Sequence, residues 1–221
     1  MISDNCLNFL KKLKKNNNTE WFHANKNLYL QAKEDFESFV NIVIHEIGHF
    51  DKSISHLDVK DCIFRINRDI RFTNDKSPYK TNFGAYFAAG GKKSIFAGYY
   101  IHIDPDEYFL SGGLYMPESN VLKAVRKEIY ENTEEFKKII KSASFKKQFG
   151  GLWEEGKLKS APRDFPKDFP DIDLLKYKHY IVSKEQTEKS IQSPKFINEI
   201  RTVFQALFPF NSFMNKAIEN I

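Results

Sequence analysis

The hydrophobic period of this sequence changes twice along the chain, from helical to alternating and back to helical. Near the start, three leucines recur at helical spacing after Ser3, a residue type that caps helix N-termini. The asparagine run at 16–18 ends this helix, and a longer helical region then extends from about residue 20 to residue 49. An interruption near Asn25 would divide that region. The first fifty residues are therefore predicted to be helical.

The alternating pattern occupies the middle of the chain. From Cys62 to Asp69, apolar and polar residues alternate, which predicts a strand whose side chains point to opposite faces in turn. We predict three further strands at 83–89, 94–103 and 107–115, with turns at Gly90-Gly91 and Asp104-Pro105-Asp106. Because short turns join antiparallel neighbours, the sheet is expected to be mainly antiparallel.

Helical spacing returns after Pro117, with apolar stripes at 122–129 and 136–140. Three prolines make residues 161–173 an extended loop. We then predict an edge strand at 174–182, a capping box formed by Ser183 and Gln186, and a last helix that begins at Ser193-Pro194. No repeat or low-complexity linker divides the chain. The pattern predicts an α+β protein, a single domain over residues 1–221 with a mainly antiparallel central sheet flanked by N-terminal and C-terminal helices.

Composition supports a folded protein. The chain is 41% hydrophobic and 29% charged and has 21 Phe, 10 Tyr and 2 Trp, whose rings bury large areas. The net charge of +5 permits anionic partners without requiring them. Cys6 and Cys62 form no disulfide framework, the N-terminus has no signal-peptide pattern, and no apolar run is long enough to span a membrane. We expect a cytoplasmic protein that does not enter the membrane.

The sequence His45-Glu46-Ile47-Gly48-His49 matches H-E-x-x-H, in which two histidines on one helix face bind zinc and the glutamate activates water. In the extended form of this motif a third histidine occupies the position of Ser55, and His56 misses it by one residue. A downstream glutamate such as Glu118 is the alternative third ligand. However, the apolar stripe of this helix lies nearly opposite both histidines. We predict that they face solvent and bind no metal, so a zinc hydrolase is the disfavoured function.

The densest charge lies between Arg65 and Lys80. In a strand, Arg65, Asn67, Asp69 and Arg71 would share one face, and the following turn would bring the end of the segment close to them. Arginine side chains bind carboxylate or phosphate through paired donors. The candidate ligand-binding residues are Arg65, Asn67, Arg68, Arg71, Lys76, Tyr79 and Lys80.

Two interpretations of this segment remain open. In the first, the basic residues bind a phosphate-bearing ligand, and Asp69, Asp75 or His102 acts as acid, base or magnesium ligand if a reaction occurs. In the second, an ion-pair network only ties the loop to the sheet. A non-catalytic nucleic-acid-binding or protein-binding module is the alternative function, with Tyr79, Tyr99 or Tyr100 on the same basic face. No nucleic-acid-binding motif is legible, and no cofactor is identified.

The sequence resembles the bacterial and fungal family catalogued as domain of unknown function 2461. The resemblance covers nearly the full length and is most specific in the block from Arg65 to Asn82. Asp164 departs from the family pattern Pro-Arg-Gly-Phe, which places glycine there. The resemblance implies no established activity and leaves the H-E-x-x-H outside the family signature. The other matching segments are Asn17 to Phe22, Gly98 to His102, Gly112 to Leu114, Pro162-Arg163 and Leu174 to Lys176.

Overall fold

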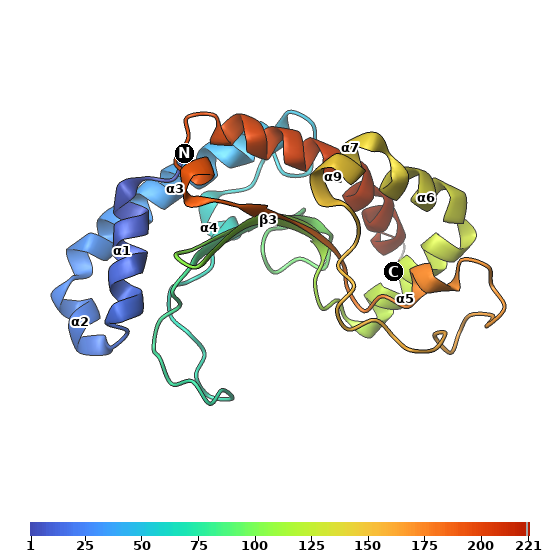
Figure 1. Ribbon diagram of the computed structural model, residues 1–221, viewed down its shortest axis with the longest axis horizontal. Helices are drawn as coiled ribbons and strands as arrows, with labels where there is room; N and C mark the ends of the chain where they lie inside the picture. Colours follow the sequence, from blue (N-terminus) through green and yellow to red (C-terminus); the bar gives the residue numbers. More distant parts are fainter. Residues whose placement is uncertain (220) are drawn as a thin grey trace.

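The computed structural model describes residues 1–219 and 221 and shows a four-stranded sheet with helices packed along one of its faces (Figure 1). Four helices precede the sheet: α1 (Asp4–Lys15), α2 (Thr19–Ala24), α3 (Lys26–Gly48) and α4 (Val59–Cys62). The strands are β1 (Phe83–Phe87), β2 (Gly98–Asp104), β3 (Glu107–Leu114) and β4 (Tyr180–Gln186). Between β3 and β4 lie α5 (Ser119–Glu131), α6 (Thr133–Lys141), α7 (Ala143–Phe149) and the 3₁₀ helix η1 (Ile172–Leu175). Helices α8 (Glu188–Ile191) and α9 (Phe196–Ile218) complete the chain.

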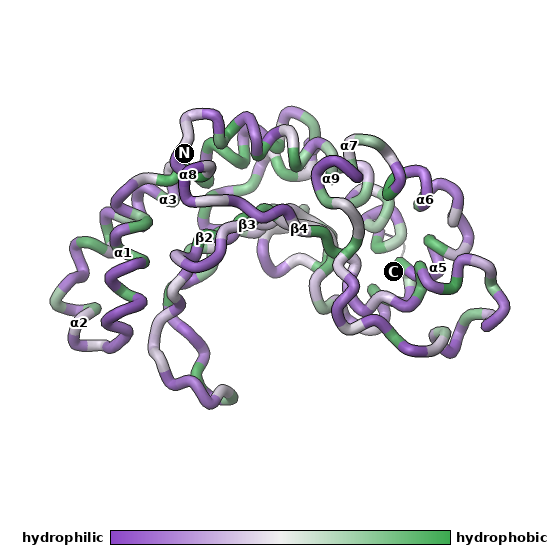
Figure 2. Tube along the Cα trace, viewed as in Figure 1, coloured by the Kyte–Doolittle hydropathy of each residue, from purple (hydrophilic) through white to green (hydrophobic). Residues whose placement is uncertain are grey.

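The N-terminal helices begin and end at the predicted signals. The Ser3 hydroxyl accepts a hydrogen bond from the Cys6 amide and caps α1. The Asn18 side chain caps α2 by accepting a bond from the Trp21 amide, and Asn25 separates α2 from α3. Apolar residues of α1 alternate with polar ones along the helix (Figure 2), as expected for a helix with one buried face.

The sheet has the order β1-β2-β3-β4, and every neighbouring pair is antiparallel. The predicted α+β class and antiparallel sheet are therefore confirmed. Helices α3 and α9 run along one face (Figure 1), against the fully buried side chains of Tyr99 and Ile101. Because side chains alternate along a strand, Tyr100 and His102 point to the opposite face.

The strand predicted at 94–103 begins later than expected, at Gly98. Two hydrogen bonds join the Asn215 side chain on α9 to the backbone of Ala97, at 2.7 Å and 3.1 Å. The N–H and carbonyl groups of Ala97 therefore have hydrogen-bond partners without pairing to another strand. Gly90 and Gly91 both have φ above +80°, in the connection that precedes β2.

The predictions around β4 need correction. Residues 172–175 form η1 instead of an edge strand, and the strand that pairs with β3 starts at Tyr180. Ser183 and Gln186 lie inside this strand and form no capping box. The helix cap is Thr187, whose hydroxyl accepts a bond from the Ser190 amide. Pairing with β3 overrides the local helix signal here.

A single continuous core joins the sheet to the helices. Its members range from Ile2 to Ile218, and phenylalanines supply many of its ring contacts, such as Phe136 with Phe213 at 5.2 Å between centroids. Among the described residues, no helix is both long and apolar enough to span a membrane.

Candidate functional site

Residues 64–82, called the arm below, leave the edge of the sheet, extend away from it and return to β1 (Figure 1). The predicted strand at 62–69 is wrong: this region makes only isolated bridges, Ile63 to Ala85 and Asn67 to Tyr79. Arg65, Asn67, Asp69 and Arg71 are exposed and Ile66 is buried, but Phe64 and Phe72 are exposed as well, so exposure does not alternate along the whole segment. The two sides of the arm pair only at its base, so no regular strand forms.

The base of the arm is fixed by backbone hydrogen bonds and by Asn17. The Arg68 amide donates to the Pro78 carbonyl at 3.0 Å, and the Lys80 amide donates to the Ile66 carbonyl at 2.8 Å. The Asn17 amide group bonds both the carbonyl and the N–H of Tyr79, at 2.9 Å and 3.2 Å. These bonds hold the start and end of the arm side by side.

Tyr79 acts as a support of the arm. Its ring is 6% exposed and stacks on Phe22 of α2 with centroids 3.9 Å apart and planes 14° apart. Its backbone is the part held by Asn17. The structure therefore places this predicted ligand-binding residue in the packing between the arm and the N-terminal helices.

Most charges of the arm pair with one another. Asp75 pairs with Arg68, and Asp69 binds Arg71 through two hydrogen bonds at 2.9 Å and 2.6 Å. Lys76 donates to the Ile70 carbonyl at 2.9 Å. The guanidinium of Arg71 holds the pKa of Asp69 below its usual range, and the Ser77 hydroxyl and amide, with Arg68, lower that of Asp75.

Arg65 and Lys80 differ from Arg68 and Arg71, the two arginines of the arm that pair with carboxylates. Among the described residues, no carboxylate forms an ion pair with either of them. Burial, and next the positive charge of Arg65, lower the pKa of the Lys80 ammonium. The Lys80 Nζ lies 5.4 Å from the ring centroid of Phe64. Arg65 and Lys80 therefore repel each other, although the charge of Arg65, after the hydrogen bonds from Arg71, also lowers the pKa of Asp69.

The adjacent sheet face carries a tyrosine and a histidine in contact. The Tyr100 hydroxyl lies 2.9 Å from His102 Nδ1, and the Phe64 ring meets the Tyr100 ring edge-on at 6.3 Å. His102 also stacks on Phe109 of β3 at 4.6 Å. Gly84 makes room for this arrangement, because a Cβ there would lie 2.7 Å from the Tyr100 oxygen.

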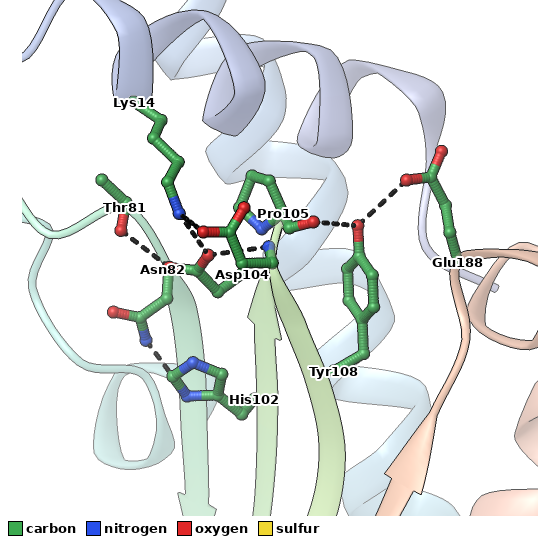
Figure 3. Close-up of polar contacts among 9 residues, drawn as sticks. Lys14, Thr81, Asn82, His102, Asp104, Pro105, Tyr108 and Glu188 are labelled. Atoms are coloured by element: carbon green, nitrogen blue, oxygen red, sulfur yellow. Dashed lines mark hydrogen bonds and ion pairs between the residues drawn. The ribbon is translucent and has the colours of Figure 1, made fainter.

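The protonation of the histidine follows from its neighbours. Asn82 Nδ2 lies 3.5 Å from His102 Nδ1 (Figure 3), and with Nδ1 as the acceptor the ring proton resides on Nε2. Burial lowers the pKa of His102, although Asp104 and Glu107 act in the opposite direction. Burial also raises the pKa of Tyr100 to about 12. Both groups are therefore neutral near pH 7.

A second set of charges at the same edge is fully paired. Lys14 of α1 forms ion pairs with Asp104 and Asp106, and the Thr81 hydroxyl donates to Asp104 at 2.7 Å (Figure 3). The Tyr108 hydroxyl bonds Glu188 at 3.0 Å in the same view. These contacts tie the strand ends to α1 and α8 and leave Asp104 committed to structural partners.

The seven predicted ligand-binding residues and three predicted catalytic candidates thus separate into groups. Lys80 and His102 lie around one patch of the sheet face beside Phe64 and Tyr100, and the charge of Arg65 acts on Lys80. Arg68 and Arg71 pair with carboxylates of the arm, and Lys76 donates to a backbone carbonyl. Asn67 is exposed at the arm's base. Phe64 and Asn82 also lie at this patch and are not among the residues predicted from the sequence. Asn82 directly precedes β1.

The H-E-x-x-H segment lies on α3. His45 and His49 are exposed, as the helical wheel predicts, and Glu46 pairs with Arg201 of α9. That pairing lowers the pKa of Glu46. Among residues 1–219 and 221, no group of three or more His, Cys, Asp or Glu side chains is arranged to hold a metal ion.

Comparison with known proteins gives one family. Residues 5–213 match the family described as conserved hypothetical protein (DUF2461). The chain belongs to the DUF2461 family. No curated protein and no solved structure matches it. In this DUF2461 protein, the arm and the segment Gly98 to His102, both part of the sequence resemblance, lie together at the candidate site.

Proposed function

We propose that this DUF2461 protein binds a phosphate-bearing anion where the base of the arm meets the sheet, through Arg65 and Lys80. The observation that carries the proposal is the absence of an ion-pair partner for these two cations among the described residues, while the neighbouring arginines of the arm have partners. Bringing an anion between two like charges removes their repulsion. The arm is then a scaffold in which Arg68 and Arg71 are neutralised by Asp75 and Asp69.

The donor set suits phosphate. The Arg65 guanidinium offers paired N–H groups, the Lys80 ammonium offers a compact charge, and His102 Nε2–H offers a neutral donor. Phosphate presents several charged oxygens for such a set. Phe64, Tyr100 and Phe109 add ring surface beside these donors, which suits a phosphate attached to an organic group.

If the ligand undergoes a reaction, His102 is the group placed to move a proton. Its Nε2 has no hydrogen-bond partner among the described residues, and its lowered pKa keeps the ring neutral. Asp69 and Asp75 instead remain ionised and bound to their own arginines. We assign them to holding the arm and not to acid–base chemistry.

Nucleic-acid binding is a second candidate because of the tip of the arm. Phe72 is 93% exposed there, and the Arg71 guanidinium carbon lies 5.5 Å from its ring centroid. Exposed aromatic rings beside arginines stack on bases of single strands. Loss of single-stranded RNA or DNA binding in Phe72→Ala, with phosphate binding intact, would select this candidate.

We further propose that residues 1–221 act as one domain and that the protein works in the cytoplasm. The continuous core from Ile2 to Ile218 supports the first statement. The second is supported by Cys6 and Cys62, which are both buried free thiols.

Thermal unfolding in phosphate tests the proposed site. The wild type should gain stability from sodium phosphate beyond the effect of sodium chloride at equal ionic strength. Without phosphate, Lys80→Met should unfold at no lower a temperature than the wild type, because it removes a half-buried charge repelled by Arg65. With phosphate, this variant should show no gain in stability. Arg71→Gln removes an exposed ion pair of the same arm and should still gain stability from phosphate. A wild type that does not respond to phosphate contradicts the proposal.

A further inference from the structure

A second basic region lies far along the chain, between α5 and the extended loop before η1 (Figure 1). A pocket of about 320 Å³ opens there. This size is at the lower end of the range for small-molecule sites. It is lined by Lys123, Arg126, Leu158, Ser160, Ala161, Pro162, Arg163, Asp164 and Phe165.

The charges of this pocket do not balance. Lys123, Arg126 and Arg163 bring three positive charges, and Asp164 brings the only negative charge among the described residues of the lining. Asp164 pairs with Lys123 at 2.9 Å. Arg126 and Arg163 are left without a carboxylate partner in the part of the chain that the structure describes. Two guanidinium groups at one pocket favour an anion.

Arg126 is held in a fixed position with hydrogen-bonding capacity to spare. Its Nη2 donates to the Tyr177 carbonyl at 2.8 Å, while its Nε is buried and has no partner in the structure. A buried donor without an acceptor is costly, and an anion bound beside this guanidinium would lessen that cost. The loop beside it is fixed as well, by the Leu158 amide bonding the Lys176 carbonyl at 2.8 Å.

The same pocket has an apolar part. Leu158, Ala161 and Phe165 contribute to its lining, and the Phe165 ring lies 5.7 Å from that of Tyr130. Apolar lining with a few charged groups is typical of sites that orient an organic ligand by one charged end. An anionic head would meet the arginines, and an apolar body would meet Phe165.

We propose that this pocket is a second ligand site, specific for small organic anions with a phosphate or carboxylate head and an apolar body. Arg126 and Arg163 bind the head. Asp164 weakens binding by its negative charge and by holding Lys123 away from the ligand. The site shares no residue with the one formed by Arg65 and Lys80.

Calorimetric titration of the full chain tests this site. The background variant is Lys80→Met, so that the first site does not contribute, and the probes are phenyl phosphate, benzoate and inorganic phosphate. We expect saturable binding of at least one aromatic probe, tighter than inorganic phosphate. The tighter aromatic probe identifies the head that the site prefers.

Two further substitutions locate the binding. Arg163→Ala, at an exposed position, should weaken it by about tenfold or more, the value of a hydrogen bond to a charged group. Asp164→Asn should strengthen it. Lys127→Ala, which removes an exposed charge of α5 outside the pocket, is the matched control and should have no effect. Absence of saturable binding, or equal affinity in Arg163→Ala, overturns the proposal.

Discussion

Burial lowers the pKa of both Lys80 and His102, and in each case the charged form is disfavoured. The consequences differ because the neighbours differ. Lys80 is repelled by the positive charge of Arg65, so a bound anion would reduce this repulsion. Burial keeps His102 neutral, and with Nδ1 facing Asn82 and Tyr100 the Nε2 atom is the donor that remains. One residue supplies charge to the proposed site and the other supplies a neutral donor.

The pH dependence of stability should report His102. Its folded-state pKa lies below the ordinary 6.5, so the unfolded chain binds more protons between these two values. Stability is therefore retained above pH 6.5 and falls as the pH drops towards the folded-state value. Urea unfolding from pH 7.5 to 5 should show a smaller loss in His102→Gln than in the wild type. Identical pH profiles would mean that His102 titrates normally.

At the scale of elements, the arm depends on contacts made from outside it. Asn17 lies between α1 and α2, yet it bonds both backbone groups of Tyr79. The contact with Tyr79 could not be predicted from the sequence, because the two residues are 62 positions apart. The N-terminal helices therefore set the geometry from which Lys80 is presented.

Asn17→Ala should destabilise the protein by about 2 kcal/mol, because it leaves two backbone groups without partners. Amide hydrogen exchange should accelerate at Tyr79 and Lys80 before the rest of the sheet. The matched control is Asn74→Ala near the arm's tip, where the described residues offer its side chain no hydrogen-bond partner. Equal exchange rates in the two variants would show that Asn17 does not anchor the arm.

The sheet has a comparable constraint at Gly113 of β3. Its φ is +106°, and a Cβ there would lie 2.0 Å from the Tyr180 carbonyl oxygen on β4. Gly113→Ala should cost about 3 kcal/mol or more, because backbone has to move. Gly151→Ala, where a Cβ would meet nothing within 4 Å, should change stability by about 0.5 kcal/mol or less. Chemical denaturation of both variants checks this, and similar midpoints would refute it.

The parts of the fold that sequence predicts well are those with local signals. Ser3 and Asn25 mark helix ends, and Asp104 to Asp106 mark the turn between β2 and β3. The start of β2 and the position of β4 were missed because they depend on Asn215 and on pairing with β3, both distant in sequence. Local residue patterns do not contain that information.

The candidate site was predicted only in part for the same reason. Arg65, Lys80 and His102 follow from charge density and strand alternation. The separation of paired from unpaired cations does not, because Asp69 is adjacent to Arg68 in the sequence and yet pairs with Arg71, two residues away. Only the folded arm shows that Asp69 binds Arg71 and that Asp75 binds Arg68.

At the scale of the whole molecule, the helix layer formed by α3 and α9 covers one sheet face, and the arm descends from the other side (Figure 1). The two proposed anion sites lie in different parts of this architecture, one at the arm and one beside α5. Beside the first site, the ion pair of Lys14 with Asp104 is structural. Cations without an ion-pair partner among the described residues occur at both sites.

The pKa of Lys80 measured with and without phosphate tests the central claim most directly. Nuclear magnetic resonance of the lysine Cε groups gives this value, and the Lys80 signal is assigned by its loss in Lys80→Met. In sodium chloride, the pKa should lie below the ordinary 10.5 because of burial and Arg65. In sodium phosphate at equal ionic strength it should rise, because a bound anion favours the charged ammonium. A Lys80 pKa that is the same in both salts would contradict an anion site at Arg65 and Lys80.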